Sequence, residues 1–402
     1  MVSWRCFAAA DWPRFRGSNG TGVAETAGLQ VEFWSSEKHA VEDRAPTGIL
    51  LAGIGRQPNL RDGIRRRKKL FTMCLNLKTG KMEWQRAAQR ARRTKSQGTN
   101  TPVSPSPVTD GRNVYVFFED FGLVSYAPDG SERWRQPLGP FNNPYGMAAS
   151  PILSDGKVIQ RCDQDTNSFL IALDAKDGHV LWKTERPEAT HGFSTPAIYG
   201  SSKAPAQVIV SGSYQVAAYA VDTGEKLWWV HGMAWQAKSV PVVDGDIVYV
   251  HSWMASTAEL GLQNVPSFAE VLKQYDANHD GKIARDEVPD AEMKKLWFLF
   301  DLDQDGYMNE REWNIHRSRG TAGNGLFAIR AGGKCDVTDT HVVWRFEKSL
   351  PNIPSPILYK GVMYVLREGG ILTALDPKSD PILKQGRLEG ALDPSLRIAR
   401  RR

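Results

Sequence analysis

The chain has 402 residues, of which 41% are hydrophobic, 36 are glycine and 13 are tryptophan. That length can bury a large core, and frequent Gly and Trp are typical of repetitive β architectures. No run of 18 apolar residues occurs, so the sequence offers no transmembrane helix. The four cysteines form no CxxC pair, which argues against a zinc site and leaves disulfide pairing and redox compartment open.

The net charge of +6 comes from clustered basic residues at 65–69, 90–95 and 397–402. Single-sign runs of this kind are usually solvated loops or tails. No aromatic residues alternate with them as a stacking platform, so we expect no nucleic-acid partner.

Two motifs recur along the chain. Ser, Thr or Val precedes a proline at Pro107, Pro151, Pro196, Pro241 and Pro356, with separations of 44, 45, 45 and 115 residues. Thr or Asp followed by Gly, with Trp four positions after the Gly, ends at Trp84, Trp134, Trp182 and Trp228, and a copy ending at Trp344 has lost its glycine. Two markers that share a period near 45 to 50 residues predict structural repeats.

Each repeat contains short segments rich in β-branched and aromatic residues, such as 113–118, 169–174, 207–211 and 246–252. These favour strands, and the Gly step supplies the positive φ of a hairpin turn. The Trp then lies at a fixed place on the last strand, where its ring can fill the space between neighbouring sheets. Four short strands in about 45 residues match one propeller blade. A β-sandwich does not require a Trp at one register in four successive units.

The predicted fold is therefore mainly β: a β-propeller of four-stranded blades, about six of them recognisable, whose ring need not close. Residues 40–69 interrupt the β rhythm. The long interval between Pro241 and Pro356 indicates an insertion with helical spacing. We predict N-terminal blades at 1–257, an EF-hand pair at 258–325, C-terminal blades at 326–393 and a basic tail at 394–402.

The insert carries the strongest chemical signal. Residues 276–287 read DANHDGKIARDE and residues 301–312 read DLDQDGYMNERE. Both match the EF-hand loop, which offers Ca²⁺ about six to eight oxygen ligands. A pair of acidic surface turns is the plain alternative, but two tandem matches, each after an amphipathic run, favour calcium. Magnesium prefers octahedral sites that keep several waters.

The predicted ligands follow the loop positions. In the first site they are Asp276, Asn278 and Asp280, the backbone carbonyl of Lys282, and both carboxylate oxygens of Glu287. In the second they are Asp301, Asp303, Asp305, the backbone carbonyl of Tyr307, and Glu312, with Asn309 acting through water. Ile283 and Met308 hold the position at which paired loops exchange a short β-bridge.

Only residues 288–300 separate the loops, which leaves room for about one helix at ~1.5 Å per residue. Pro289 and Asp290 resemble a helix start. We expect Trp297 and Phe300 to pack this shared helix onto the rest. A compact structural site, in which ions rigidify an insert docked on the propeller, fits this spacing better than a sensor that opens.

Three motifs together resemble the PQQ-binding-like (quinoprotein-like) β-propeller repeat proteins: DWPRFRG at 11–17, the Gly-to-Trp repeats, and GPFNNPYGMAASPIL from Gly139. An EF-hand pair within one blade resembles large secreted members typical of planctomycete-like bacteria. The resemblance covers roughly 11–28 and 71–393. It is specific for the fold and implies little about activity.

That resemblance implies two classes of function. One is quinoprotein dehydrogenases, which oxidise alcohols or sugars with pyrroloquinoline quinone (PQQ) and calcium in the central funnel. The other is non-catalytic propellers similar to the lipoprotein scaffold of outer-membrane protein assembly. Alcohol-type dehydrogenases usually carry adjacent cysteines, which this chain lacks. The chain is also short for an eight-bladed enzyme, and its calcium loops lie outside the funnel.

Other polar residues have plainer explanations. Asp163, Asp165 and Asn167 are spaced like the start of a calcium loop, but Ser168 replaces the glycine, which favours a turn between strands. Asn142, Asn143 and Tyr145 form a polar loop that could contact a ligand, although loop polarity alone explains them. A lone His191 is more often structural than catalytic. No Ser-His-Asp set, P-loop or nucleotide motif occurs in a supporting context.

We therefore expect a non-enzymatic calcium-binding propeller with two Ca²⁺ sites and no PQQ. It is expected to bind an unidentified protein or glycan on its loop face. The alternative is a PQQ-dependent dehydrogenase acting on alcohols or sugars. We expect export to the periplasm or beyond, although residues 1–10 lack the apolar length of a complete signal. A signal remnant and a plain N-terminus both remain open.

Overall fold

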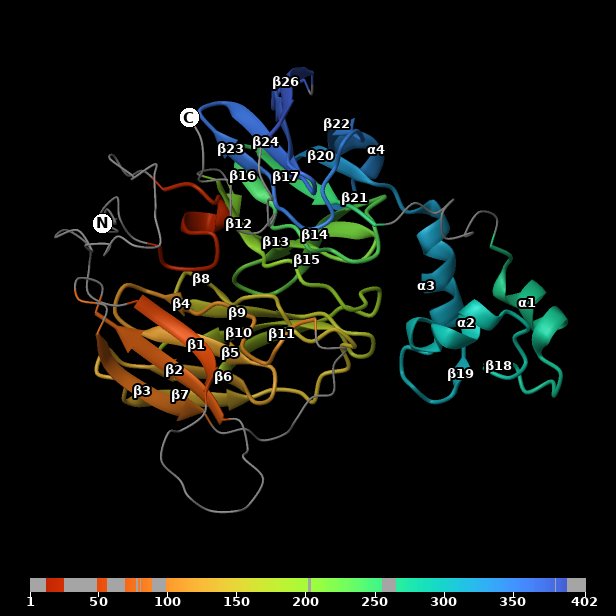
Figure 1. The fold of residues 1–402 in the computed structure, drawn as a ribbon, viewed down its shortest axis with the longest axis horizontal. Coiled ribbons are helices and arrows are strands. Elements are labelled where there is room, and N and C mark those ends of the chain that lie inside the picture. Colours follow the sequence, from red (N-terminus) through yellow and green to blue (C-terminus); the bar gives the residue numbers. More distant parts are fainter. Residues whose placement is uncertain are drawn as a thin grey trace, which may run out of the picture.

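The computed structural model describes residues 12–24, 49–55, 69–76, 79, 81–88, 99–201, 204–254, 265–379 and 381–388. The first ten residues, the basic clusters at 90–95 and 397–402, most of the cluster at 65–69, and the predicted tail at 394–402 lie outside these ranges. The described strands form six sheets of three to five strands and one separate two-stranded sheet. Figure 1 shows the sheets grouped side by side, with the helical insert at one edge.

We number the six larger sheets as blades in chain order. Blade 1 contains β1 (Ile49–Gly55), β2 (Lys69–Leu75) and β3 (Met82–Ala88). Blade 2 contains β4 (Val108–Thr109), β5 (Val114–Phe118), β6 (Gly122–Tyr126) and β7 (Glu132–Pro137). Blade 3 contains β8 (Ile152–Ser154), β9 (Lys157–Cys162), β10 (Phe169–Asp174) and β11 (Val180–Glu185).

Blade 4 contains β12 (Ala197–Ser201), β13 (Ala204–Ser211), β14 (Gln215–Ala220), β15 (Lys226–His231) and the added β21 (Cys335–Asp336). Blade 5 contains β16 (Val242–Asp244), β17 (Ile247–Ser252), β20 (Gly325–Arg330) and β22 (Val342–Phe346). Blade 6 contains β23 (Ile357–Tyr359), β24 (Val362–Arg367), β25 (Ile371–Leu375) and β26 (Ile382–Arg387).

The helices are few. They are η1 (Ser18–Gly20), α1 (Phe268–Tyr275), α2 (Ala291–Lys295), η2 (Trp297–Leu299), α3 (Glu310–Thr321) and α4 (Thr338–His341), and β18 (Ile283–Ala284) pairs with β19 (Tyr307–Met308). Among the described residues, no helix is long and apolar enough to cross a membrane. The predicted mainly β fold of four-stranded blades is confirmed. The predicted interruption of the β pattern at 40–69 is wrong for residues 49–55, because this apolar run forms β1 and pairs with β2.

One irregularity recurs in every blade. The register between the last two strands shifts directly after Cys74, Ser125, Ala172, Ala218, Ala328 and Ala374. The first five of these small residues lie opposite Trp84, Trp134, Trp182, Trp228 and Trp344, whereas Ala374 lies opposite Lys384. A bulge re-aims the side chains beside it. The repeated Trp therefore holds one structural position, as its spacing predicts.

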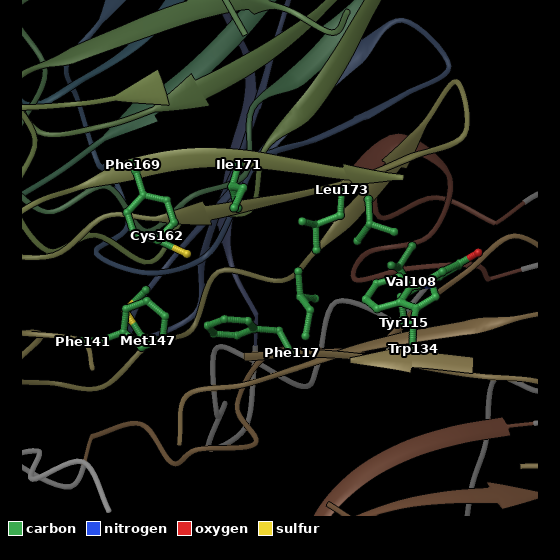
Figure 2. Close-up of a cluster of buried hydrophobic side chains, with 12 residues drawn as sticks. Val108, Tyr115, Phe117, Trp134, Phe141, Met147, Cys162, Phe169, Ile171 and Leu173 are labelled. Carbon is green, nitrogen blue, oxygen red and sulfur yellow. The ribbon is translucent and has the colours of Figure 1, made fainter. Parts of the chain in front are cut away.

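Neighbouring blades pack face to face through apolar clusters. Between blades 2 and 3, Tyr115, Phe117 and Leu123 meet Cys162, Phe169 and Ile171, and Figure 2 shows side chains of the two sheets directed toward one another. Equivalent clusters join blades 1 and 2, 3 and 4, 4 and 5, and 5 and 6. Blades 2 to 5 are thus each buried on the blade before and the blade after, which is the packing of a propeller.

The two halves of the Gly-to-Trp motif meet across blade boundaries. The indole of Trp134 covers Gly178 of the next blade, where an added Cβ would lie 2.6 Å from the ring, and its Nε1 donates to the Ala175 carbonyl at 3.1 Å. Trp84 relates to Gly130 in the same way, and Trp182 to Gly224. The glycine is required both by its positive φ and by the ring that rests on it.

Blade 5 has lost this glycine, and the contact changes accordingly. Trp228 is fully buried, and its Nε1 donates within its own blade to Oε1 of Gln207 at 2.8 Å. β21 lies against Trp228 and Trp229 as a parallel fifth strand. The chain between β20 and β22, which includes β21, therefore lies beside Trp228, where the boundaries between blades 1 and 2, 2 and 3, and 3 and 4 have a glycine turn.

The Ser/Thr-Pro motif links the blades at their first strands. The N–H of Ser106 donates to Oγ of Ser150 at 2.9 Å, and the N–H of Ser150 donates to Oγ1 of Thr195 at 3.0 Å. Further along, the N–H of Val240 donates to Oγ of Ser355 at 3.0 Å. The hydroxyls of Ser150, Thr195 and Ser355 thus each accept a backbone hydrogen bond from the preceding blade, which gives Ser or Thr at these positions a physical reason.

The segment from Trp12 to Ala24 ties these first strands together, and Figure 1 shows it in red beside β12. Its Pro13 carbonyl accepts from Thr109 of blade 2, and Arg14 donates to the Pro196 carbonyl at 2.7 Å. Asn19 forms a two-point pair with the backbone of Ile198 in blade 4, and Arg16 donates to the Pro356 carbonyl of blade 6 at 2.7 Å. One short segment therefore joins non-adjacent blades.

The Trp-on-Gly contact gives a first testable prediction. Gly178 and Gly156 both have positive φ, of 80° and 71°, but an added Cβ meets the Trp134 ring only at Gly178. We expect Gly156→Ala to cost about 1 kcal/mol from backbone strain and Gly178→Ala at least about 2 kcal/mol more from the overlap. Denaturant unfolding of both variants measures the difference, and equal losses would contradict the contact's role.

A second prediction concerns Arg14, which is 7% exposed. Burial lowers its pKa to about 10, and its Nη2 donates to the Pro196 carbonyl. Arg14→Ala should reduce the free energy of unfolding by about 1.5–3 kcal/mol, because a charged donor to a buried carbonyl is lost. The exposed Arg112→Ala serves as control. Equal thermal stability of Arg14→Ala and Arg112→Ala would contradict a stabilising role for the Arg14–Pro196 hydrogen bond.

Candidate metal centre

The two predicted loops lie between β17 and β20 of blade 5. The ladder between these strands continues without a shift from Ile247 paired with Arg330 to Ser252 paired with Gly325, so the insert leaves the blade intact. The insert runs through α1, the first loop, β18, α2, η2, the second loop, β19 and α3.

Local sequence explains the helix starts. Ser267 caps α1 and forms a capping box with Glu270, and Asp290 caps α2 by accepting from Glu292 and Met293. Asn309 caps α3 in a capping box whose other member is Glu312, the last predicted ligand of the second loop. Such boxes satisfy two orphan backbone donors at once. Here the box also fixes the direction of the Glu312 carboxylate.

The two loops share one internal geometry. In the first, Asp276 accepts from the N–H groups of Asp280 and Gly281, at 3.1 and 3.0 Å. In the second, Asp301 accepts from Asp305 and Gly306 at the same distances. The fourth residues, His279 and Gln304, are left-handed in both, with φ of 59° and 61°.

The later positions also correspond. The N–H of Lys282 donates to Asp280, and that of Tyr307 donates to Asp305, both at 2.9 Å. Glu287 accepts from Ala277 and Ala284, while Glu312 accepts from Leu302, Asp303 and Asn309. The carboxylates of each loop thus turn inward along the same backbone path. In the second loop, carboxylate oxygens of Asp301, Asp303 and Asp305 lie within 4.8 Å of one another.

The second loop is the more buried. Glu312 is 1% exposed and Asp301 is 5% exposed. Burial, with a further contribution from the Asp303 carboxylate, raises the pKa of Glu312 to about 7, although backbone donors oppose it. Burial likewise raises the pKa of Asp301, aided by Asp305 and Asp303. Among the described residues, neither carboxylate has a cationic side chain as a salt-bridge partner.

The loops are held together by strand pairing and a small core. Ile283 pairs with Met308 in the β18–β19 bridge, as their loop positions predict. Around the bridge pack Phe268, Val271, Val288, Trp297, Phe300 and Trp313. The linking region contains only α2 and η2, so the shared helix expected between the loops is broken at Leu296.

The insert docks on the propeller through its second half. Nδ2 of Asn142 donates to the Leu302 carbonyl at 2.6 Å, and Nε2 of Gln304 donates to Oδ1 of Asn142 at 2.9 Å. Arg311 donates to the carbonyls of Asp165 and Pro187, each at 3.3 Å. Asn142, which on sequence grounds could contact a ligand, forms two hydrogen bonds with the second loop.

The remaining sequence candidates lie beneath this docking surface. Asp163 is fully buried between Arg161 and Arg186, in the connection from β9 to β10. Asp165 accepts from Nδ1 of His191 at 2.5 Å, and the other ring nitrogen lies 2.8 Å from the Gln236 amide nitrogen. Asn143 is buried and caps the turn at Tyr145, and Asn167 is exposed at a left-handed turn. These residues do not converge on the calcium loops.

Sequence reasoning missed Arg311 and Gln304 as docking residues. Both lie at non-ligand positions of the EF-hand pattern, and their partners are backbone carbonyls or an amide far away in the chain. The missed contacts have sequence separations of 124 to 162 residues. The polar run Asn142–Asn143 was the one available signal, and it pointed to the correct face without naming its partner.

Comparison with known proteins agrees with the repeat assignment. A family model described as outer membrane protein assembly factor BamB matches residues 71–228, which is less than half of the chain. No curated protein matches. The strand order and the repeated Trp register make the chain a β-propeller, and the family match lies within its first four blades.

Several solved structures are similar to the chain at low identity. BamB from Moraxella catarrhalis is 13% identical, with 85% of this chain and 92% of that chain covered and a TM-score of 0.38. Quinohemoprotein alcohol dehydrogenase from Comamonas testosteroni is 13% identical, covers 94% and 73%, and has a TM-score of 0.45. A europium-containing methanol dehydrogenase is 10% identical, covers 86% and 77%, and has a TM-score of 0.37.

The buried Asp163 gives a third prediction. Burial opposes its ionisation, but Arg161 and Arg186 outweigh this and hold its pKa below the ordinary value. Since the folded pKa is depressed, the stabilisation is present at neutral pH and is lost as pH falls below about 4, through the folded pKa. Asp163→Asn should cost about 3–5 kcal/mol at pH 7 by leaving two buried guanidinium groups without their carboxylate.

The control is Asp339→Asn, which changes an exposed carboxylate in α4. Chemical unfolding at pH 7 and at pH 3 separates the two effects. The difference between Asp163→Asn and the unchanged protein should shrink at the lower pH. A variant as stable as the control at pH 7 would contradict the assigned ion pairs.

Proposed function

We propose that this chain is a calcium-binding β-propeller that acts as a non-enzymatic binding or scaffold protein. The observation that carries the metal half is the shared geometry of residues 276–287 and 301–312. In both, carboxylate and amide oxygens turn inward along one backbone path and the loops pair through β18 and β19.

The chemistry of the donor set supports calcium. Its side-chain ligands would be Asp276, Asn278, Asp280 and Glu287 in one loop, and Asp301, Asp303, Asp305 and Glu312 in the other. Hard oxygen donors of this kind suit Ca²⁺ rather than softer transition metals. A bound cation would offset the cost of burying Asp301 and Glu312, which lack a cationic partner among the described residues.

The arrangement supports a structural role for the ions. A sensor needs helix pairs that can swing apart and expose an apolar groove. Here the first loop is followed by the five-residue α2, and the apolar side chains of the insert pack into one core. Calcium would therefore rigidify the insert and its seat on the propeller.

The scaffold half of the proposal is supported by the architecture. PQQ-like repeats supply large loop faces, and a binding partner would be a protein or a glycan on the face that carries the insert. Export fits this reading, because external calcium is abundant enough for modules of modest affinity. The segment Trp12–Ala24 lies against the first strands of blades 2, 4 and 6.

The competing dehydrogenase hypothesis has a direct test. The protein is mixed with PQQ and calcium, and absorbance and dye reduction are followed with a panel of alcohols and sugars. We expect neither a bound-cofactor spectrum nor turnover. Substrate-dependent dye reduction would replace the scaffold half of the proposal with the enzymatic one.

The fourth prediction tests the metal itself. Calorimetric titration with CaCl₂ should reveal two sites, and Glu287→Gln and Glu312→Gln should each remove one. At calcium a hundredfold above Kd, each site should stabilise the fold by about 2.7 kcal/mol and raise Tm relative to chelator. Asp286→Asn, beside a ligand but outside the ligand set, is the control. No heat of binding and an unchanged Tm would refute the proposed calcium binding.

A further inference from the structure

The insert meets the propeller through one calcium loop and not the other. Leu302 and Gln304, at the second and fourth positions of the second loop, both bond Asn142 of the connection between blades 2 and 3. The corresponding residues of the first loop, Ala277 and His279, are exposed. Among the described residues, the hydrogen bonds of the first loop stay within the insert.

The Asn142 contact depends on how the loop is wrapped. Leu302 and Gln304 alternate with Asp301, Asp303 and Asp305, so their directions follow from the inward turn of those three carboxylates. Gln304 takes a left-handed φ of 61°, which places its side chain outside the loop. An extended or splayed loop could not present the Leu302 carbonyl and the Gln304 amide to one asparagine.

The neighbouring helix α3 adds hydrogen bonds to the same contact between the insert and the propeller. Arg311, in the first turn of α3, donates to the Asp165 and Pro187 carbonyls, while the Tyr214 hydroxyl donates to the Ile315 carbonyl at 2.9 Å. The capping box between Asn309 and Glu312 joins α3 to the last ligand of the loop. Movement of Glu312 would therefore move both Arg311 and the Asn142 contact.

The docked insert covers an aromatic cluster of the propeller. Phe298 lies edge-on to Tyr145 with ring centroids 6.5 Å apart, and Tyr145 lies 5.4 Å from His191. His191 is fully buried and also packs on Trp235 at 4.8 Å. Leu299 packs against the cluster that contains Trp235 and Met254. The insert thus forms a lid over the Asp165–His191 pair.

We propose that ion occupancy of the second loop, rather than the first, latches this lid onto the propeller. The inference rests on the proposed calcium sites, and adds that one of them controls the exposure of a specific surface. The latch is Asn142 bound to Leu302 and Gln304, with Arg311 alongside. Release of the ion frees the loop backbone, breaks the paired contact to Asn142, and uncovers Tyr145 and His191.

Hydrogen–deuterium exchange on the full chain tests the latch. Added calcium should slow exchange in the insert and also in propeller segments 139–147 and 186–193, while 362–375 of blade 6 stays constant. Calorimetry on the same samples reports ion binding independently. If calcium binds but the two propeller segments exchange at unchanged rates, the latch is wrong and the calcium-binding proposal stands. If no calcium binds, both fail.

Ligand variants separate the two loops. At calcium concentrations that calorimetry shows to saturate the remaining site, Glu287→Gln should keep the slowed exchange at 186–193, and Glu312→Gln should lose it. The same response from both variants would show that the latch is not specific to the second loop, and would overturn it.

A matched pair outside the ligand set completes the test. Gln304→Ala and His279→Ala change exposed residues at the same loop position and with nearly the same left-handed φ. Of these two residues, Gln304 is the one that contacts Asn142. With both ions bound, Gln304→Ala should speed exchange at 186–193 by about three- to tenfold, the net effect of one hydrogen bond. His279→Ala should leave it unchanged, and equal rates in the two variants would refute the assigned contact.

Discussion

The indole of one blade resting on the glycine of the next is the contact on which the propeller depends. It fixes the distance between sheets, because the ring occupies the volume that any Cβ would need. It also fixes their rotation, because the same indole donates to a backbone carbonyl beside that glycine. The bulge opposite each Trp sets the direction of the ring. Between blades 1 and 2, 2 and 3, and 3 and 4, spacing, angle and register therefore come from one side chain per repeat.

A second set of contacts holds the blades at their first strands. The hydroxyls of Ser150, Thr195 and Ser355 each accept from the preceding blade, and the segment Trp12–Ala24 bonds blades 2, 4 and 6. These contacts lie at the start of the blades, away from the Trp contacts near their ends. Loops between these points are free to vary in length. This explains how blade 5 accepts an insert of helices and metal loops between two strands that keep an uninterrupted ladder.

Periodic features of the fold could be predicted from sequence because each repeat must satisfy the same packing demand. The strands, the Trp position and the Ile283–Met308 bridge follow from local patterns of this kind. Contacts made once in the molecule could not be predicted. Examples are the contacts of β21 with Trp228, of Arg14 with Pro196 and of Asn142 with the second loop. Each joins residues more than a hundred positions apart, and no repeated motif marks it in the sequence. Residues 49–55 were missed because β1 lacks the markers of the other blades.

The two metal loops are alike in backbone and different in setting, and burial accounts for the difference. In the first loop Asp280 is exposed and Glu287 is half-buried, so these carboxylates can be hydrated when no ion is bound, and the hydrogen bonds of that loop stay within the insert. Asp301 and Glu312 are withdrawn from water, and burial disfavours their charged forms. Their folded arrangement therefore calls for compensation, which a bound divalent cation would supply. The more buried of the two predicted sites is also the one in contact with the propeller, so an ion bound there would act directly on the docking of the insert.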